Sequence, residues 1–231
     1  QRRDGHVDVL PSFGCMLGYL VKTENESMVI FLGILALAIL ALLVDILSRP
    51  FYIHRGLTDT EWKSSWFGDE FVPGAAPGGS RALLIEAPAA AVWPWLTQIG
   101  QDRAGFYSYR WLENLVGAKM PDVRELRPEW STRSVGQKLI MAPVERFGPI
   151  AAMDIVALEE NRAIVTRNAE GVWSFLLVPI SDNRCRLVAR GTWLPARNWF
   201  LRLMHGLVFD PMHYVMEWKM LRSIKKLAEH R

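Results

Sequence analysis

The segment DPMHYVMEWKMLRSIKKLAE, residues 210–229, has the periodicity of a long amphipathic helix. At the helical spacing of roughly 100° per residue, its apolar side chains fall on one broad face and most of its charged side chains on the other. The apolar face contains Met212, Met216, Met220, Leu221, Ile224, Leu227 and Ala228. Asp210 is a favourable N-cap, and Pro211 is favourable at the first helical position. We therefore predict a C-terminal helix that packs its apolar face against a core.

The residues before this helix predict an antiparallel sheet. Short apolar runs are separated by PVERFGP, EENR, NAEG and SDNR, which are turn sequences of the length found in hairpins. In the last run Cys185 and Leu187 alternate with Arg184, Arg186 and Arg190, so we expect one buried face and one solvated face. The predicted strands are 81–86, 137–142, 150–158, 163–167, 172–180 and 185–193, and the predicted helices after the first strand are 88–99 and 106–116.

This order of elements predicts an α+β domain with a cavity. A curved antiparallel sheet needs cover on its inner face, and residues 210–229 form the long helix available to supply it. A sheet that curves around a helix leaves a gap between the two, and such gaps bind ligands.

A second apolar stretch lies near the start of the chain. Residues 28–44, MVIFLGILALAILALLV, carry no charge, and about 20 helical residues span the hydrocarbon core of a bilayer, about 30 Å. We predict an N-terminal polar segment at 1–27, a transmembrane helix at 28–47, a juxtamembrane connector at 48–80 and one domain at 81–231. A buried core helix is the alternative for 28–47, and Met28 is an alternative first residue.

The expected location is the plasma membrane, crossed once. Arg49 and Arg55 follow the apolar stretch closely, so the positive-inside rule favours a cytoplasmic C-terminal domain. The lipid bilayer is therefore an expected partner.

Composition argues against several other classes of function. The net charge is only +3, and Lys and Arg form no dense run, so we expect no nucleic-acid partner. The two cysteines, Cys15 and Cys185, give no disulfide framework and no zinc-type cluster. The sequence contains no GxSxG, Walker, GxGxxG or HExxH motif. We expect neither a metal nor a cofactor.

Several stretches resemble the START-like superfamily, also called SRPBCC or helix-grip, and in particular its bacterial membrane-anchored members. The resemblance covers about residues 49–231. It is carried by RPFYIHRGLTDTE (49–61), IEAPAAAVWPWLTQIGQDRAGFYSYRWLENLVG (85–117), RPEW (127–130), VGQKL (135–139) and residues 210–229. It implies a helix-grip fold, in which a curved antiparallel sheet surrounds a long C-terminal helix. It also implies a hydrophobic or amphipathic ligand, which some members of the family carry and others act on.

The C-terminal helix provides the first candidate site. His213 and Glu217 lie four residues apart within its apolar stripe, so their side chains are neighbours. Polar groups that face a core need partners. The two side chains either satisfy each other or Arg103 and so hold the helix in place, or they form a polar contact inside a ligand cavity. Met216 and Met220 on the same face suit an adaptable apolar pocket, although ordinary core packing explains them equally well.

The loop GQDRAG and the residues after it provide the second candidate site. Arg103, Tyr107 and Tyr109 belong to a polar and aromatic group that could line the mouth of the cavity and fix the polar end of a ligand. The alternative is a structural loop that orients the two helices on either side.

The leading interpretation is a membrane-anchored domain that binds a small hydrophobic or lipid-like molecule between the sheet and the C-terminal helix. One alternative is an enzyme in the same cavity, such as a cyclase, dehydratase or isomerase. His213 would then be the acid–base group oriented by Glu217, and Arg103 or Tyr107 would polarise a carbonyl. The other alternative is a membrane-bound protein-interaction module.

Overall fold

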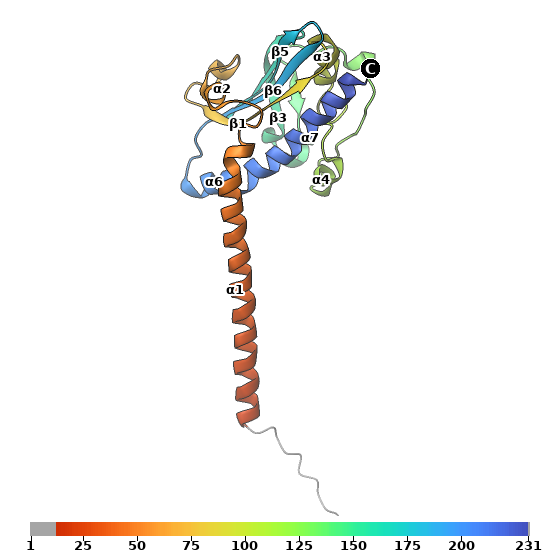
Figure 1. Ribbon diagram of the computed structural model, residues 1–231. Helices are drawn as coiled ribbons and strands as arrows, with labels where there is room; N and C mark the ends of the chain where they lie inside the picture. Colours follow the sequence, from red (N-terminus) through yellow and green to blue (C-terminus); the bar gives the residue numbers. More distant parts are fainter. Residues whose placement is uncertain (1–12, 231) are drawn as a thin grey trace, which may run out of the picture. The chain divides into compact units, whose positions relative to one another are not determined.

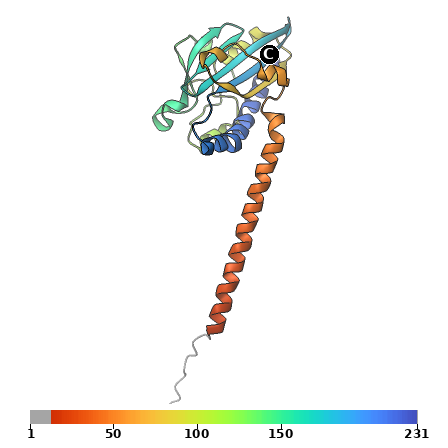
Figure 2. The same cartoon turned by 90° about the vertical axis from the view of Figure 1, so that its left-hand side faces the viewer.

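The computed structural model describes residues 13–230, and it describes side chains from Glu26 onward. The chain divides into two compact units, with the boundary between Leu47 and Ser48. Figures 1 and 2 show the chain from two directions.

The first unit contains most of helix α1, Phe13–Tyr52. Its segment Glu26–Tyr52, 27 residues long, has the length and composition needed to cross a membrane, and none of its most apolar part is buried. Leu37 and Leu47 are 67% and 71% exposed. Continuous exposure of such side chains is unfavourable in water and favourable in lipid.

The second unit is built on a six-stranded antiparallel sheet with the order β1-β6-β5-β4-β3-β2. The first and last strands of the chain are therefore neighbours, and Ile85 of β1 lies opposite Cys185 of β6. All six predicted strands are present, and the first begins earlier than predicted. The strands are β1 (Ala76–Ile85), β2 (Lys138–Ile140), β3 (Ala152–Glu159), β4 (Ala163–Arg167), β5 (Gly171–Ser181) and β6 (Arg184–Trp193).

The helices of this unit occupy the connections and the C-terminus. They are α2 (Asp59–Lys63), α3 (Ala89–Thr97), α4 (Arg110–Leu115), α5 (Val144–Phe147), α6 (Trp199–Met204) and α7 (Asp210–Glu229), with the short turns η1 (Asp69–Phe71), η2 (Pro128–Trp130), η3 (Pro149–Ala151) and η4 (His205–Phe209). The helix predicted at 106–116 is shorter and begins only at Arg110. Tyr107 has a φ of 53°, which lies in the left-handed region and cannot continue a right-handed helix.

Helix α7 lies across the inner face of the sheet (Figure 1) and contacts β1, β6 and α3. Its residues Met220, Leu221 and Ile224 are buried in the main core, together with Phe175 and Leu187 from the sheet. The second unit is thus an α+β helix-grip fold, as predicted, with a curved antiparallel sheet against a long C-terminal helix.

Helix α7 does not begin with a cap. Helix α6, the π turn η4 and α7 follow one another without interruption, and both Phe209 and Asp210 have right-handed helical backbone angles. The prediction that Asp210 caps this helix was therefore wrong. Its carboxylate instead accepts a hydrogen bond from Arg49, which also donates to the carbonyl oxygen of Gly206 at 3.2 Å. The N-cap is Asn198, whose side chain accepts from the backbone N–H of Leu201.

The outer face of the sheet is covered as well. Residues that were expected to form a connector fold onto it, and Leu57 and Trp62 pack with Ala82 and Val188. At Gly56, φ is +83° and an added Cβ would lie 2.0 Å from the carbonyl oxygen of Ala82, so only glycine fits this close approach.

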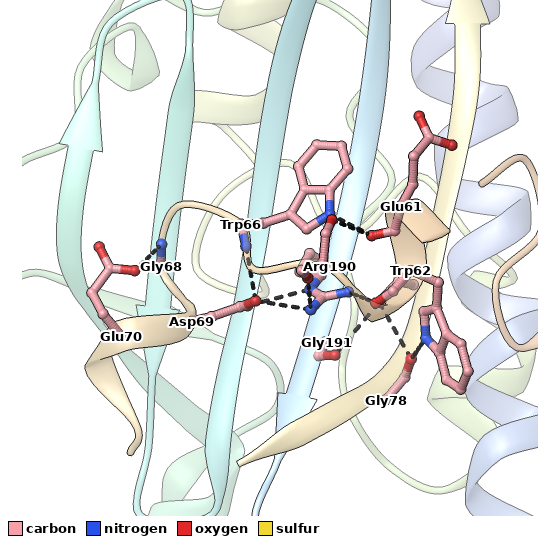
Figure 3. A network of polar contacts seen from close by, with 11 residues as sticks. Glu61, Trp62, Trp66, Gly68, Asp69, Glu70, Gly78, Arg190 and Gly191 are labelled. Atoms are coloured by element: carbon pink, nitrogen blue, oxygen red, sulfur yellow. Dashed lines mark hydrogen bonds and ion pairs between the residues drawn. The ribbon is translucent and has the colours of Figure 1, made fainter. Parts of the chain in front are cut away.

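Arg190 on β6 lies under this cover and is 1% exposed. Its guanidinium pairs with Asp69 at 2.8 Å and donates to the carbonyl oxygen of Trp62 at 2.6 Å (Figure 3). The prediction that Arg190 faces solvent was wrong, because the alternation of residues in β6 does not reveal that another part of the chain covers that face. The carboxylate of Asp69 also accepts from the backbone N–H of Trp66, which fixes the covering loop (Figure 3).

Candidate functional site

A cavity of about 500 Å³ lies between the inner face of the sheet and the first half of α7. Its walls come from strands of the sheet, from α4, from the turn η4 and from α7. Most of the lining side chains are apolar and large; they include Phe106, Leu112, Met153, Trp173, Met216 and Met220. This size and composition lie within the range typical of sites for small organic ligands.

A fully buried ion pair joins Glu217, a lining residue of the cavity, to an arginine behind the lining. The side chains of Arg81 on β1 and Glu217 on α7 are both 0% exposed, and Arg81 Nη1 lies 2.7 Å from Glu217 Oε2. The other carboxylate oxygen of Glu217 accepts from the indole N–H of Trp173 at 2.8 Å. Both oxygens therefore have donors, which a buried carboxylate requires.

His213 lies beside this ion pair and is 35% exposed. Its Nδ1 is 3.3 Å from Arg81 Nη1, and its Nε2 is 3.8 Å from Glu217 Oε1, which exceeds hydrogen-bonding distance. Because an arginine only donates, the contact favours the tautomer with the proton on Nε2. Burial lowers the pKa of His213, the charge of Glu217 opposes that effect and the charge of Arg81 reinforces it. The lowered pKa favours a neutral imidazole, and His213 is one of the residues that line the cavity.

Glu113 on α4 also lines the cavity. Its Oε2 is buried and has no hydrogen-bond partner among the described residues. Burial, assisted by the negative charge of Asp122, raises the pKa of Glu113 to about 7.

Of the predicted site residues, His213, Glu217, Met216 and Met220 all line the cavity. Arg103 does not line it and donates instead to the carbonyl oxygens of Thr97, Trp130 and Thr132, at 3.0, 3.2 and 3.0 Å. These bonds hold the loop after α3. The expected contact between Arg103 and the His213–Glu217 pair is replaced by Arg81.

Tyr107 and Tyr109 also lie away from the cavity lining. Tyr107 is buried, and its hydroxyl accepts from Gln98 Nε2 at 2.9 Å. Burial raises its pKa, with a smaller contribution from Asp122, while the hydrogen bond from Gln98 opposes the shift. Tyr109 lines a separate hollow of about 810 Å³ on the other side of α7, together with basic residues such as Lys219. The structure therefore does not bring together the four residues of the enzyme interpretation.

The described residues contain no group of three or more His, Cys, Asp or Glu side chains that could hold a metal ion. Cys185 is buried in the core, and burial raises the pKa of its thiol to about 11. The polar groups that the cavity offers on its mostly apolar surface include the imidazole of His213 and the carboxyl group of Glu113.

Sequence reasoning did not assign three residues of the site: Arg81, Trp173 and Glu113. Arg81 shares its strand face with Leu83 and Ile85, so alternation placed a cation on the inner face opposite Glu217. An aromatic residue in a predicted strand, such as Trp173, gives no indication that its indole N–H will donate to a buried carboxylate. Glu113 lies next to Leu112 and one helical turn before Val116, both of which line the cavity, so helical spacing could have placed it there.

Comparisons with known proteins add the following. No model of a protein family matches the sequence, and no curated protein matches it. Solved structures with a similar chain course include a polyketide cyclase-like protein from Corynebacterium glutamicum, with 16% identity over 68% of this chain and 88% of that one and a TM-score of 0.31.

Two further structures are similar. A START superfamily protein from Mycobacterium smegmatis has 12% identity over 62% of this chain and 96% of that one, with a TM-score of 0.31. Norcoclaurine synthase from Thalictrum flavum, solved with dopamine and hydroxybenzaldehyde, has 14% identity over 73% of this chain and 95% of that one, with a TM-score of 0.36. The sheet order and the C-terminal helix across the inner face give this chain the helix-grip fold that the sequence resemblance implied.

Proposed function

We propose that this protein is a membrane-anchored domain that binds a small hydrophobic or lipid-like molecule in the cavity between the sheet and α7. The observation that carries the proposal is the cavity itself, about 500 Å³ with mostly apolar walls. An interaction module with a filled core would have no such space.

The polar groups of the cavity have different roles in this proposal. Glu217 has donors on both oxygens, so it braces α7 against β1 and β5. His213 keeps Nε2–H for a ligand, while Met216 and Met220 supply flexible apolar contacts. The ligand is therefore held mainly by apolar burial and oriented by a few polar contacts.

The anchor in this proposal is the segment 28–47, here called the tether. Its length and apolar composition support a single span of the cell membrane. Arg49 and Arg55 follow it closely, which supports a cytoplasmic second unit. Arg49 also contacts Gly206 and Asp210, next to the cavity wall. In this proposal the covalent link between the tether and the second unit keeps the cavity close to the bilayer, where lipid-like molecules are concentrated.

The proposal is tested by native mass spectrometry of the full-length protein purified in detergent. We expect a copurified lipid or apolar metabolite, and we expect the variant Ala142→Trp, which fills part of the cavity, to lose it. The matched control is Ala90→Trp on the exposed surface of α3, which should retain the ligand. Equal occupancy in both variants, or no ligand and no binding of added decanol to the unmodified protein, would refute the proposal.

A further inference from the structure

We propose that Glu113 is the polar subsite of the cavity and that the cavity selects amphiphiles with a protonated amine over those with an anionic headgroup. This inference rests on the proposed ligand-binding function and specifies the chemistry of the ligand.

The first observation is the carboxyl group of Glu113. Its Oε2 is buried, and no described residue donates a hydrogen bond to that oxygen. A buried acceptor without a donor is unfavourable, so proteins almost always provide one. Here the neighbouring lining residues Leu112, Val116 and Met120 offer no side-chain donor. A donor on a bound ligand would satisfy Glu113.

The second observation is the charge of the cavity wall. The described lining contains four acidic residues, Glu113, Glu170, Asp210 and Glu217, and neither Lys nor Arg. Two of these acids have cations outside the lining: Arg49 pairs with Asp210, and Arg81 pairs with Glu217. Glu170 is exposed to solvent. Glu113 is therefore the half-buried acid for which the described residues supply no cation.

The third observation concerns the protonation of Glu113. Burial and the charge of Asp122 raise its pKa to about 7, so the neutral acid and the carboxylate are both populated near neutral pH. An ammonium group beside Glu113 would stabilise the carboxylate and form a charge-assisted hydrogen bond. An anionic headgroup would meet unfavourable charge and no compensating cation.

These three observations define the ligand class as an amphiphile whose apolar part lies against Met153, Trp173 and Met216 and whose amine reaches Glu113. An alcohol of the same chain length can donate one hydrogen bond but brings no charge. It therefore measures apolar binding separately from the contribution of the headgroup.

The test compares decylamine, decanol and decanoate, which share one alkyl chain, by native mass spectrometry on the full-length protein in one detergent. Each ligand is titrated against the unmodified protein and Glu113→Gln, so partitioning into detergent cancels in the ratio. We expect Glu113→Gln to weaken decylamine binding about 10-fold or more, to change decanol binding less than about 2-fold, and to strengthen decanoate binding.

Two more variants make the result specific. Glu113→Asp keeps the carboxylate and should keep the preference for the amine, whereas Glu170→Gln removes an exposed acid from the same wall and should leave the preference unchanged. An unchanged amine affinity in a folded Glu113→Gln protein would overturn the inference. The same loss in Glu170→Gln would also overturn it, because diffuse negative potential would then explain the selectivity. If the unmodified protein binds no decanol, the ligand-binding function itself fails.

Discussion

Arg81 of β1 and Glu217 of α7 form an ion pair, 2.7 Å between Nη1 and Oε2, in which neither side chain is exposed. It joins the edge strand β1 to the helix that covers the sheet. Removing one partner of such a pair leaves an uncompensated buried charge, whereas replacing both by apolar residues can be nearly neutral.

We therefore expect Arg81→Met to lower the free energy of unfolding by about 3–5 kcal/mol. The double variant Arg81→Met with Glu217→Leu should recover a large part of that loss. Chemical denaturation in detergent measures both. Lys138→Met, which breaks the exposed pair with Asp154, is the control and should cost about 1 kcal/mol or less. If Arg81→Met proves as stable as the double variant, the carboxylate of Glu217 is not left as an uncompensated buried charge.

His213 and Glu217 should separate into a ligand contact and a structural brace. His213→Phe should weaken binding of a copurified ligand by about 5- to 150-fold with a small change in stability, because it removes one hydrogen bond inside the cavity. Glu217→Gln should mainly destabilise the fold, because Arg81 loses its counter-charge. Calorimetric titration and melting curves of both variants decide between the roles. Unchanged affinity in a well-folded His213→Phe protein would remove His213 from the binding site.

Glu113 should make stability depend on pH. Its pKa is about 7 in the folded protein against an ordinary value of 4.5. Folding therefore favours the protonated form, and the associated stability is complete below about pH 4.5 and is lost as the pH rises through about 7. The difference in unfolding free energy between the unmodified protein and Glu113→Gln should shift by roughly 1–2 kcal/mol across this window, because partial exposure screens the charge. A flat difference would contradict the burial of this carboxyl group.

The cover on the outer face sets where the folded unit begins. A chain that starts at Ser48 should melt cooperatively and show mixed helix and strand by circular dichroism. A chain that starts at Arg81 lacks Asp69 and the carbonyl oxygen of Trp62, so Arg190 would lose its partners. We expect the shorter chain to aggregate or to melt without cooperativity. Equal folding of the two chains would mean that residues 48–80 are not part of the domain.

The tether should hold the full-length protein in the membrane. Carbonate washing removes peripheral proteins, so we expect the unmodified protein to stay in the washed membrane fraction. A chain that starts at Ser48 serves as the control and should appear in the wash. Release of the full-length protein would contradict a membrane span.

The local pattern of the sequence was enough for the strands and the last helix. Alternation located β3 to β6 closely, since each strand is short and bounded by a turn. The same pattern could not show that another part of the chain covers the outer face of the sheet. Arg190 alternates as a solvated residue would, and only the return of residues 53–75 onto the sheet buries it.

Only the part of the candidate site that lies within one element was predictable from the local sequence pattern. Helical spacing placed His213, Met216, Glu217 and Met220 together because they belong to one helix. The partner of Glu217 comes from a strand far away in the sequence, and alternation, which places Arg81 on the inner face, does not by itself choose between Arg81 and Arg103. Which of the two meets the helix depends on the packing of the whole sheet.

Arg49 gives the second unit a mechanical property. It is the second residue of that unit, and its guanidinium contacts the carbonyl oxygen of Gly206 and the carboxylate of Asp210. A pulling force that arrives along the chain at Ser48 would reach the turn η4 through this side chain and strand β1 through the backbone of residues 52–55. Because Asp210 also lines the cavity, tension in the proposed tether would act on the wall of the proposed binding site.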